Sequence, residues 1–288
     1  MIGIKNLGVI NKKDWETVEG ILVRKGIITT TAFSDSIQDG LAALEERSWW
    51  FKYRATVVEF IINRYMNKGD MIWDVGAGNG YTTLFIQNKG YCVATLEPSF
   101  EACRNAQKRG IMNIHCGTLD REGIIDGSME SIMVLDVIEH IEDDSGFLKL
   151  MYDKLSSGAR ALITVPAFMS LWSSNDVDAC HFRRYTIPQL RELCVKSGFT
   201  VVYENYFMRF CFIPVYIIRV LFVKMGLLHR EGYRTQKEAD SMRKLEFGEK
   251  MGLVGRFLQS IENKELKRIK AGKKIPYGSS LIMVVKKA

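Results

Sequence analysis

The clearest chemical signal in the sequence is a glycine-rich turn, D-V-G-A-G-N-G, at residues 74–80. The turn follows the apolar run 71–75 and precedes a predicted helix that begins at Tyr81. Glycines at such a turn allow the backbone to bend tightly and to approach a ligand closely. Free N–H groups at the start of a helix attract an electronegative ligand group. The pattern therefore predicts a small-molecule site where a buried strand ends.

A carboxylate at the end of the next predicted strand indicates the kind of ligand. Glu97 lies 17 residues past Gly80, where a carboxylate can accept hydrogen bonds from both ribose hydroxyls of an adenosine. The turn lacks the third glycine of a dinucleotide fingerprint, because Tyr81 takes that place. No lysine–serine pair follows the glycines, so a phosphate-binding loop is not supported.

Further reactive side chains follow two later predicted strands. The segment Asp136-Val-Ile-Glu139-His140 comes directly after the apolar run 131–135, and His181 comes after the run 159–165. Ligands of α/β sheets bind beyond the carboxyl ends of the strands, so we expect these side chains on the same side as the glycine turn. Histidine exchanges protons near neutral pH, which makes the two segments candidates for acid–base chemistry.

The scaffold that positions these residues is a predicted α/β sheet. Strand and helix patterns alternate from residue 41 onward at the spacing of βαβ units. Predicted strands lie at residues 71–75, 91–96, 111–116, 131–135, 159–165, 199–204 and 280–285. We expect a doubly wound, mostly parallel sheet of seven strands with helices on both faces.

The same pattern divides the chain into four parts. Residues 1–40 form an N-terminal helical and loop extension, with a helix predicted from Asp14 to Gly26. Residues 41–205 form the core, residues 206–278 a basic helical insertion, and residues 279–288 the final strand. The insertion thus lies between the last two strands of the sheet.

Composition excludes several classes of protein. The 288 residues are 47% hydrophobic and 25% charged, which is ordinary for a globular protein and argues against disorder or a low-complexity chain. Six cysteines include no C-x-x-C pair, so neither a zinc site built from cysteine pairs nor a disulfide framework is expected. Residues 1–14 contain no apolar stretch of signal-peptide length. We therefore expect a cytoplasmic protein with reduced thiols.

The glycine turn, Glu97 and the segment 136–140 together resemble the class I S-adenosylmethionine-dependent methyltransferases, over residues 41–205 and the last strand. The stretch 166–186, which contains P-A, L-W-S and H-F-R-R-Y-T, is similar to one in bacterial methyltransferases encoded with glycan and lipid biosynthesis. The resemblance implies a Rossmann-like fold whose last strand is antiparallel, and S-adenosyl-L-methionine as the cofactor.

The resemblance also implies which residues contact the cofactor. They lie in the glycine turn, at the ends of the next strands and in the aromatic segment 45–54: Asp74, Gly76, Ala77, Gly78, Glu97, Pro98, Leu119, Leu135, Asp136, Trp50 and Arg54. Residues 76–78 would line the methionine part, and Glu97 would hold the ribose with Pro98 beside the adenine. Trp50 would cover the pocket and Arg54 would meet the cofactor carboxylate. The alternative for the aromatic segment is that its rings anchor a helix to the core.

The segment 136–140 is similar to the D/E-V-L/I-E-H motif of many O-methyltransferases, and three interpretations of it stay open. His140 can be a general base toward a hydroxyl, or it can merely cap and orient the loop. In the third interpretation a divalent metal is bound, as in quinone-precursor and small-RNA 2′-O-methyltransferases with a similar spacing. Its ligands would be Asp136, Glu139, His140 and His181. We assign His140, His181 and Glu139 as catalytic and do not favour a metal.

Two arginines and a basic region suggest that the protein binds an anionic partner or substrate group. Arg183 and Arg184 can hold an anionic substrate group, or they pair with Asp176 or Asp178. Residues 206–288 hold 18 Lys/Arg and 7 Asp/Glu, a net charge of +11. This charge suggests an anionic partner, lipid headgroups or nucleic acid, or else a solvated helical face.

The apolar part of the insertion gives two further alternatives. Residues 206–228 are apolar but interrupted by charges, and the longest uncharged run, 210–218, is too short to span a bilayer. The segment is predicted to be either an interfacial helix at the inner membrane surface or a helical subdomain that covers the active site or forms a dimer. Nothing in the sequence predicts an oligomeric state.

We predict a methyltransferase that acts on a hydroxyl oxygen of a small-molecule, glycan or lipid-linked acceptor, such as an envelope precursor. Two alternatives remain. One is an RNA-modifying methyltransferase, which is disfavoured because no nucleic-acid recognition module is found. The other is a non-catalytic protein that binds the cofactor or acts as a membrane adaptor.

Overall fold

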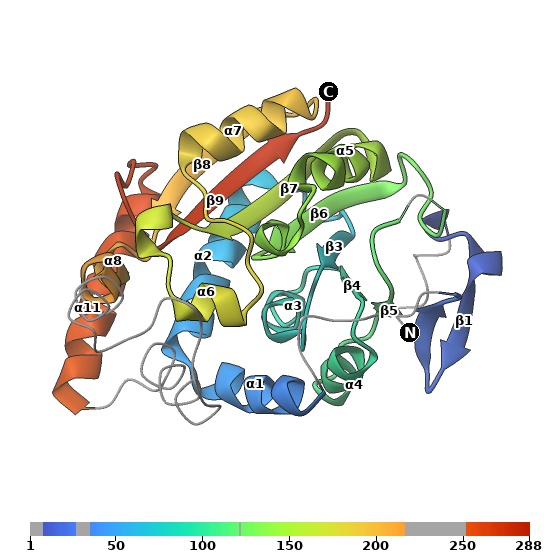
Figure 1. The fold of residues 1–288 in the computed structure, drawn as a ribbon, viewed down its shortest axis with the longest axis horizontal. Coiled ribbons are helices and arrows are strands. Elements are labelled where there is room, and N and C mark those ends of the chain that lie inside the picture. Colours follow the sequence, from blue (N-terminus) through green and yellow to red (C-terminus); the bar gives the residue numbers. More distant parts are fainter. Residues whose placement is uncertain (1–7, 27–34, 121, 217–251) are drawn as a thin grey trace.

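The structure of the protein is a computed structural model that describes residues 8–26, 35–120, 122–216 and 252–288 (Figure 1). One sheet of nine strands runs through it in the order β1-β2-β5-β4-β3-β6-β7-β9-β8. The strands are β1 (Trp15–Val18), β2 (Ile21–Arg24), β3 (Ile72–Val75), β4 (Val93–Glu97), β5 (Ile114–Cys116), β6 (Met129–Leu135), β7 (Leu155–Pro166), β8 (Thr200–Phe207) and β9 (Ser280–Lys286).

The predicted seven-stranded core is confirmed by strands β3 to β9. Neighbours from β5 through β7 pair in parallel, and β9 pairs antiparallel with both β7 and β8. All four residues of β3 and all five of β4 are buried. The short continuous apolar runs that predicted these strands therefore reflect burial on both faces of the sheet.

The predicted helix from Asp14 to Gly26 is wrong, because this segment forms the hairpin β1–β2. Glu19 and Gly20, with φ of 51° and 81°, form its turn, and two consecutive positive φ values suit a tight hairpin. β2 pairs in parallel with β5 and so extends the sheet by two strands. The Trp15 indole donates a hydrogen bond to the carbonyl oxygen of Gly123 (3.0 Å). Alternation and β-branched residues thus outweighed the helix-capping signal at Asp14.

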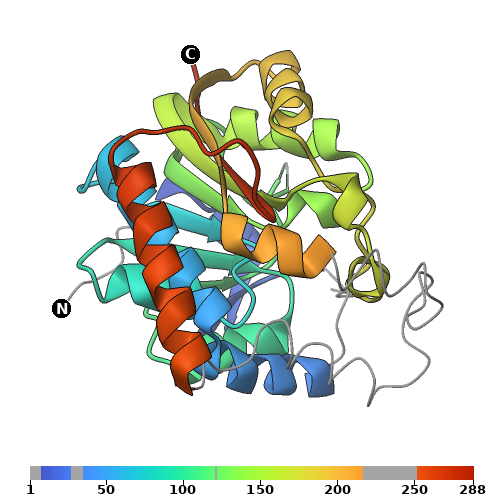
Figure 2. The ribbon, with the colours of Figure 1, turned by 90° about the vertical axis from the view of Figure 1, so that its left-hand side faces the viewer.

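Helices cover both faces of the sheet (Figures 1 and 2). α1 (Asp35–Arg47), α2 (Trp49–Tyr65), α3 (Tyr81–Gln87) and α4 (Phe100–Lys108) pack together in one group, and α5 (Asp144–Lys154) packs with α7 (Ile187–Lys196) on the other side. The short elements near the strand ends are α6 (Ser174–Asp178) and the 3₁₀ turns η2 (Lys12–Asp14), η3 (Ile138–His140) and η4 (Met169–Leu171).

The insertion between β8 and β9 is helical where the structure describes it. It contributes α8 (Arg209–Tyr216) and α11 (Gly252–Lys270), and α11 lies along the outside of α2 (Figure 2). Most of the segment 206–228 that was predicted to meet a membrane or cover the active site lies outside the described residues. Within the described parts of the chain, no helix is both long and apolar enough to cross a membrane.

Candidate active site

The glycine turn joins the end of β3 to the start of α3. Gly76, Gly78 and Gly80 have φ values of 78°, 55° and 77°, a region that L side chains rarely adopt. A Cβ atom at Gly76 would lie 2.5 Å from Cγ2 of Val137, whereas a Cβ at Gly78 would meet no atom within 4 Å. The turn is therefore closed on one side by the β6 loop and open at Gly78, where a ligand can approach the backbone.

Glu97 connects the end of β4 to this turn. Its carboxylate accepts hydrogen bonds from the backbone N–H of Gly78 (2.8 Å) and of Ser99 (2.8 Å). Burial raises the pKa of the Glu97 carboxyl, and the two backbone hydrogen bonds oppose that rise. A carboxylate offers about four acceptor sites, so both oxygens keep acceptor capacity for ribose hydroxyls.

Asp74 lies beneath the turn with one oxygen available. The Thr83 hydroxyl donates to Asp74 Oδ2 (2.5 Å), while Oδ1 is buried and has no hydrogen-bond partner among the described residues. Burial raises the pKa of Asp74 to about 6. A buried carboxylate oxygen without a donor favours a positively charged or N–H-bearing ligand group, and the amino group of S-adenosylmethionine fits this requirement.

The structure pairs two of the predicted cofactor contacts with each other. Arg54 Nη2 lies 2.6 Å from Asp136 Oδ2, and its guanidinium stacks over the ring of Trp50 at 5.3 Å. Asp136 has a positive φ of 56° and also accepts a hydrogen bond from Thr164 (3.2 Å). Arg54 Nε is buried without a partner within the described ranges, so one donor remains for a ligand carboxylate. Trp49 and Trp50 open α2, and Trp50 also packs on the core.

The remaining predicted cofactor residues lie near these strand ends. Leu119 and Leu135 are buried, and Ala77 and Pro98 are half-buried. Asp120, in the loop after β5, pairs with Arg24 Nε of the hairpin (3.1 Å). Its other oxygen accepts the backbone N–H of Glu122 (2.8 Å). Asp120 therefore stabilises the loop after β5 and joins it to the hairpin β1–β2.

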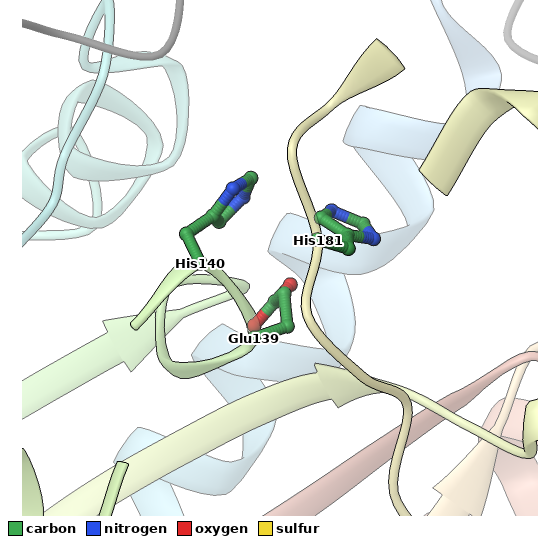
Figure 3. A group of neighbouring side chains, drawn as sticks. All are labelled: Glu139, His140 and His181. Carbon is green, nitrogen blue, oxygen red and sulfur yellow. The ribbon is translucent and has the colours of Figure 1, made fainter. Parts of the chain in front are cut away.

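The candidate catalytic residues form one cluster (Figure 3). Glu139 and His140 come from η3 after β6, and His181 comes from the loop after α6. Ligating atoms of all three side chains lie within 4.8 Å of one another, and the two imidazole rings are 4.6 Å apart at 79°. The backbone N–H of Phe182 donates to the carbonyl oxygen of Glu139 (2.8 Å), which holds the two segments together. Of the alternative metal ligands, Asp136 is held by Arg54 instead.

Glu139 is the least satisfied group of the cluster. Its side chain is fully buried, and neither carboxyl oxygen has a hydrogen-bond partner in the part of the chain that the structure describes. Burial, followed by the charge of Asp136, raises the pKa of Glu139 well above its usual range. The carboxyl group therefore holds a proton more readily than an exposed glutamate and can act as a hydrogen-bond donor.

The two histidines present nitrogen lone pairs at this cluster. Burial, together with the neighbouring His181, lowers the pKa of His140 to about 4, so its ring is neutral at pH 7. His140 Nδ1 is buried with no partner among residues whose positions are described. His181 Nδ1 lies 2.9 Å from Oδ1 of the buried Asp176. A carboxylate at that nitrogen favours the tautomer in which Nδ1 carries the proton and Nε2 is the acceptor.

Arg183 and Arg184 have internal partners rather than free guanidinium groups. Arg184 is buried and binds Asp176 through Nε (2.7 Å) and Nη2 (3.0 Å). Arg183 donates to the carbonyl oxygens of Ile141 (3.0 Å) and Glu142 (2.8 Å) and pairs with Asp144 (2.8 Å). Of the two predicted roles, the structure favours pairing within the protein over binding of a substrate anion.

The sequence analysis missed how two residues position the site, although it named Asp176 as a partner for Arg183 or Arg184. Asp176 orients His181, and its signal was the capping box that it forms with Ser173 at the start of α6. Arg109 joins α1 to the glycine turn, because it binds Glu45 (2.6 Å) and the carbonyl oxygens of Asn79 (2.8 Å) and Ala42 (2.8 Å). No local pattern marked Arg109, since its partners lie far away in sequence.

Comparison with known proteins decides the family. A family model described as a methyltransferase domain matches residues 50–204, which is more than half of the chain. The chain belongs to the class I S-adenosylmethionine-dependent methyltransferases. The predicted family and its cofactor, S-adenosylmethionine, are thereby confirmed. The matched range contains the glycine turn, Glu97 and all three residues of the cluster.

One curated relative of this methyltransferase, from Mycolicibacterium smegmatis, is named "Probable S-adenosylmethionine-dependent methyltransferase". It is 23% identical over 164 residues, which cover 56% of this chain. The match spans 63% of the relative's length, less than two thirds of it.

Solved structures with the same fold belong to proteins that are named for different activities. A chain from the complex of the Haloferax volcanii Trm112 methyltransferase activator with a methyltransferase has a TM-score of 0.55 at 14% identity, covering 90% of this chain and 99% of its own. Phosphoethanolamine N-methyltransferase 2 of Haemonchus contortus, in complex with S-adenosyl-L-methionine, has a TM-score of 0.53 at 16% identity. The match covers 92% of this chain and 61% of the other. The [4+2]-cyclase SpnF has a TM-score of 0.54 at 13% identity, covering 88% of this chain and 93% of its own. At such identities the likeness shows the fold alone.

Proposed function

We propose that this methyltransferase transfers a methyl group from S-adenosylmethionine to a hydroxyl oxygen of a small-molecule, glycan or lipid-linked acceptor. One observation carries the choice of oxygen: two imidazole rings and a buried carboxyl group converge in the Glu139–His140–His181 cluster. A hydroxyl must lose its proton as it is methylated, and a nearby general base assists that loss.

The cofactor side of the proposal rests on the strand ends of β3, β4 and β6. When bound, S-adenosylmethionine supplies an electrophilic methyl group on its sulfonium. Glu97 would accept the ribose hydroxyls, Asp74 Oδ1 would accept the amino group, and Arg54 Nε would donate to the carboxylate. Ala77 and Leu135 would line the methionine part, while Pro98 and Leu119 would lie beside the adenine.

On the acceptor side His181 is the proposed proton acceptor. Asp176 holds its Nδ1 and stabilises the imidazolium that forms when Nε2 takes the hydroxyl proton. The neutral His140 ring offers a second acceptor nitrogen, and Glu139 in its protonated form would donate a hydrogen bond to the acceptor oxygen. These roles account for the polar groups of the cluster without a metal ion.

The proposal can be tested with S-adenosylmethionine labelled on its methyl group. The purified protein is incubated with separated small-molecule, glycan, lipid and RNA fractions of cell extract, with EDTA and with Mg²⁺. We expect label in one of the first three fractions, attached to oxygen as shown by mass spectrometry of the product, and we expect EDTA to leave it unchanged. Label on nitrogen or carbon, or label confined to RNA, would contradict the proposal.

A further inference from the structure

The outer side of α11 and the loop after it form an exposed surface of one charge. We call it the basic face; it consists of Lys264, Lys267, Arg268, Lys270, Lys273 and Lys274, all of which are exposed. The two acidic residues of this stretch, Glu262 and Glu265, are buried. The face therefore has no exposed acidic residue of its own between positions 258 and 274.

The fold explains why Glu265 is buried on the inner side of α11. Glu265 accepts hydrogen bonds from the Tyr53 hydroxyl (2.7 Å) and from the backbone N–H groups of Met208 (2.7 Å) and Arg209 (2.7 Å). It thus fastens α11 to α2 and to the end of β8. On the opposite side of α11, Lys264, Lys267 and Arg268 are three and four positions apart, a spacing at which like charges destabilise a helix.

Neither ion pairing nor the helix dipole accounts for the whole face. Lys274 lies 3.6 Å from Glu204, but the other five residues have no acidic partner among those that the structure describes. A helix dipole favours basic residues in the last turn, which covers Lys267, Arg268 and Lys270. Lys264 precedes that turn, and Lys273 and Lys274 follow the helix. The concentration of charge therefore extends beyond what helix stability requires.

We propose that the basic face docks on an anionic membrane surface. Five of its six residues are lysines, which act as point charges toward dispersed headgroups rather than as the planar forks that read phosphates or bases. Residues 258–274 contain no aromatic side chain, whereas proteins that bind single-stranded nucleic acid stack bases on aromatic rings. Figure 2 shows α11 at the front of the molecule, along the outside of α2.

Electrostatic attraction sets the expected strength of this docking and its dependence on salt. Each lysine or arginine near an anionic surface strengthens binding about fivefold. The effect weakens as salt shortens the screening length to about 10 Å at 0.1 M.

The experiment measures flotation of the full-length protein with vesicles. One set is pure phosphatidylcholine, and the other contains about one phosphatidylglycerol in three lipids. We expect binding to the second set only, with affinity falling as salt rises. The triple variant Lys264→Glu, Lys267→Glu, Arg268→Glu should bind at least about 100-fold more weakly. A triple variant with glutamine at the same positions should show a smaller loss in the same direction.

The matched control has the same change of net charge elsewhere on the surface. Lys12→Glu, Lys13→Glu, Lys89→Glu replaces three exposed lysines outside the insertion and should bind vesicles like the unchanged protein. Equal losses in both glutamate variants would overturn the proposal, because only net charge would then matter. Absence of binding to phosphatidylglycerol vesicles would also overturn it. So would binding to a single-stranded oligonucleotide that is tighter than binding to vesicles and that the Lys264→Glu, Lys267→Glu, Arg268→Glu variant loses. The inference does not depend on the methyl acceptor, so it stands or fails separately from the proposed function.

Discussion

The cofactor side of the site, at β3 and β4, and the acceptor side, after β6 and β7, satisfy their polar groups in different ways. Glu97 accepts two backbone N–H groups, and Asp74 accepts the Thr83 hydroxyl. On the acceptor side, both oxygens of Glu139 and Nδ1 of His140 are buried without a partner among the described residues. On the first side the protein satisfies Glu97 but leaves Asp74 Oδ1 without a partner, whereas on the second side it leaves the whole Glu139 carboxyl group without one among the described residues.

The difference teaches which property each side controls. A pre-organised carboxylate such as Glu97 contributes to binding from the moment the cofactor enters. Unpartnered groups that gain partners only with the acceptor contribute to turnover, because their interactions form as the reaction proceeds. Substitutions on the two sides should therefore separate cofactor affinity from the rate of methyl transfer.

The largest expected effect is the loss of turnover in His181→Gln. Glutamine keeps a polar side chain but cannot accept a proton, so the rate of methyl transfer should fall by about 10²–10⁴-fold. Calorimetric titration should give an unchanged affinity for S-adenosylmethionine. If cofactor affinity fell together with the rate, the two sides of the site would not be separable.

The next effect concerns affinity and comes from Glu97→Gln. The amide has one oxygen in place of two, so its NH₂ group would face either the Gly78 or the Ser99 N–H. The affinity for S-adenosylmethionine and S-adenosylhomocysteine should fall by about 100-fold, since the amide offers fewer acceptor sites to the ribose hydroxyls. Circular dichroism checks that the variant is folded. Unchanged affinity in a folded variant would refute the role of Glu97.

On the cofactor side, Asp74 should make the folded protein less stable as pH rises. Its pKa is raised by burial from 3.8 to about 6, so the folded state holds the proton more tightly than the unfolded state. The stability that this proton contributes is present below about pH 4 and is lost as pH rises through 6, by up to about 3 kcal/mol. Denaturant unfolding of Asp74→Asn should lack this decline. An identical pH profile in both proteins would contradict the assignment.

On the acceptor side, His140 should have the opposite pH dependence. Its pKa is lowered by burial from 6.5 to about 4, so the folded state binds the proton less readily than the unfolded state. Stability from the neutral ring is present above about pH 6.5 and is lost as pH falls through 4, by up to about 3 kcal/mol. His140→Asn should reduce this acid sensitivity. Titration of the ring by NMR gives an independent measurement, and a pKa near 6.5 would refute the prediction.

The smallest effect is expected for Asp120, an acidic residue near the cofactor side whose contacts are all within the protein. Asp120→Asn weakens the pair with Arg24, which is partly exposed, and should cost about 0–1 kcal/mol of unfolding free energy. Cofactor affinity should not change, because Asp120 is occupied by Arg24 and its own loop. A measurable loss of affinity in calorimetry would show that Asp120 contributes to the cofactor site.

Prediction from the sequence succeeded where a pattern is local and failed where the partner is distant. The runs 71–75 and 91–96 matched β3 and β4 because strands buried on both faces are continuously apolar. The segment 15–24 was misread because its hairpin is held in the sheet by the pairing of β2 with β5, about 90 residues away in sequence. Asp176 was predicted only as a partner of Arg183 or Arg184, since its contact with His181 depends on how a loop folds back.

The sequence by itself determined the core of the sheet and the positions of the glycine turn and Glu97 at its strand ends. Glycine spacing and the apolar runs of buried strands can be recognised from neighbouring residues. It also placed Asp136, Glu139 and His140 at the end of one strand. Only the tertiary structure decided that Arg54 pairs with Asp136 and that His181, 41 residues beyond His140, completes the cluster. The physical reason is that burial and pairing of charges depend on long-range packing, which no local spacing encodes.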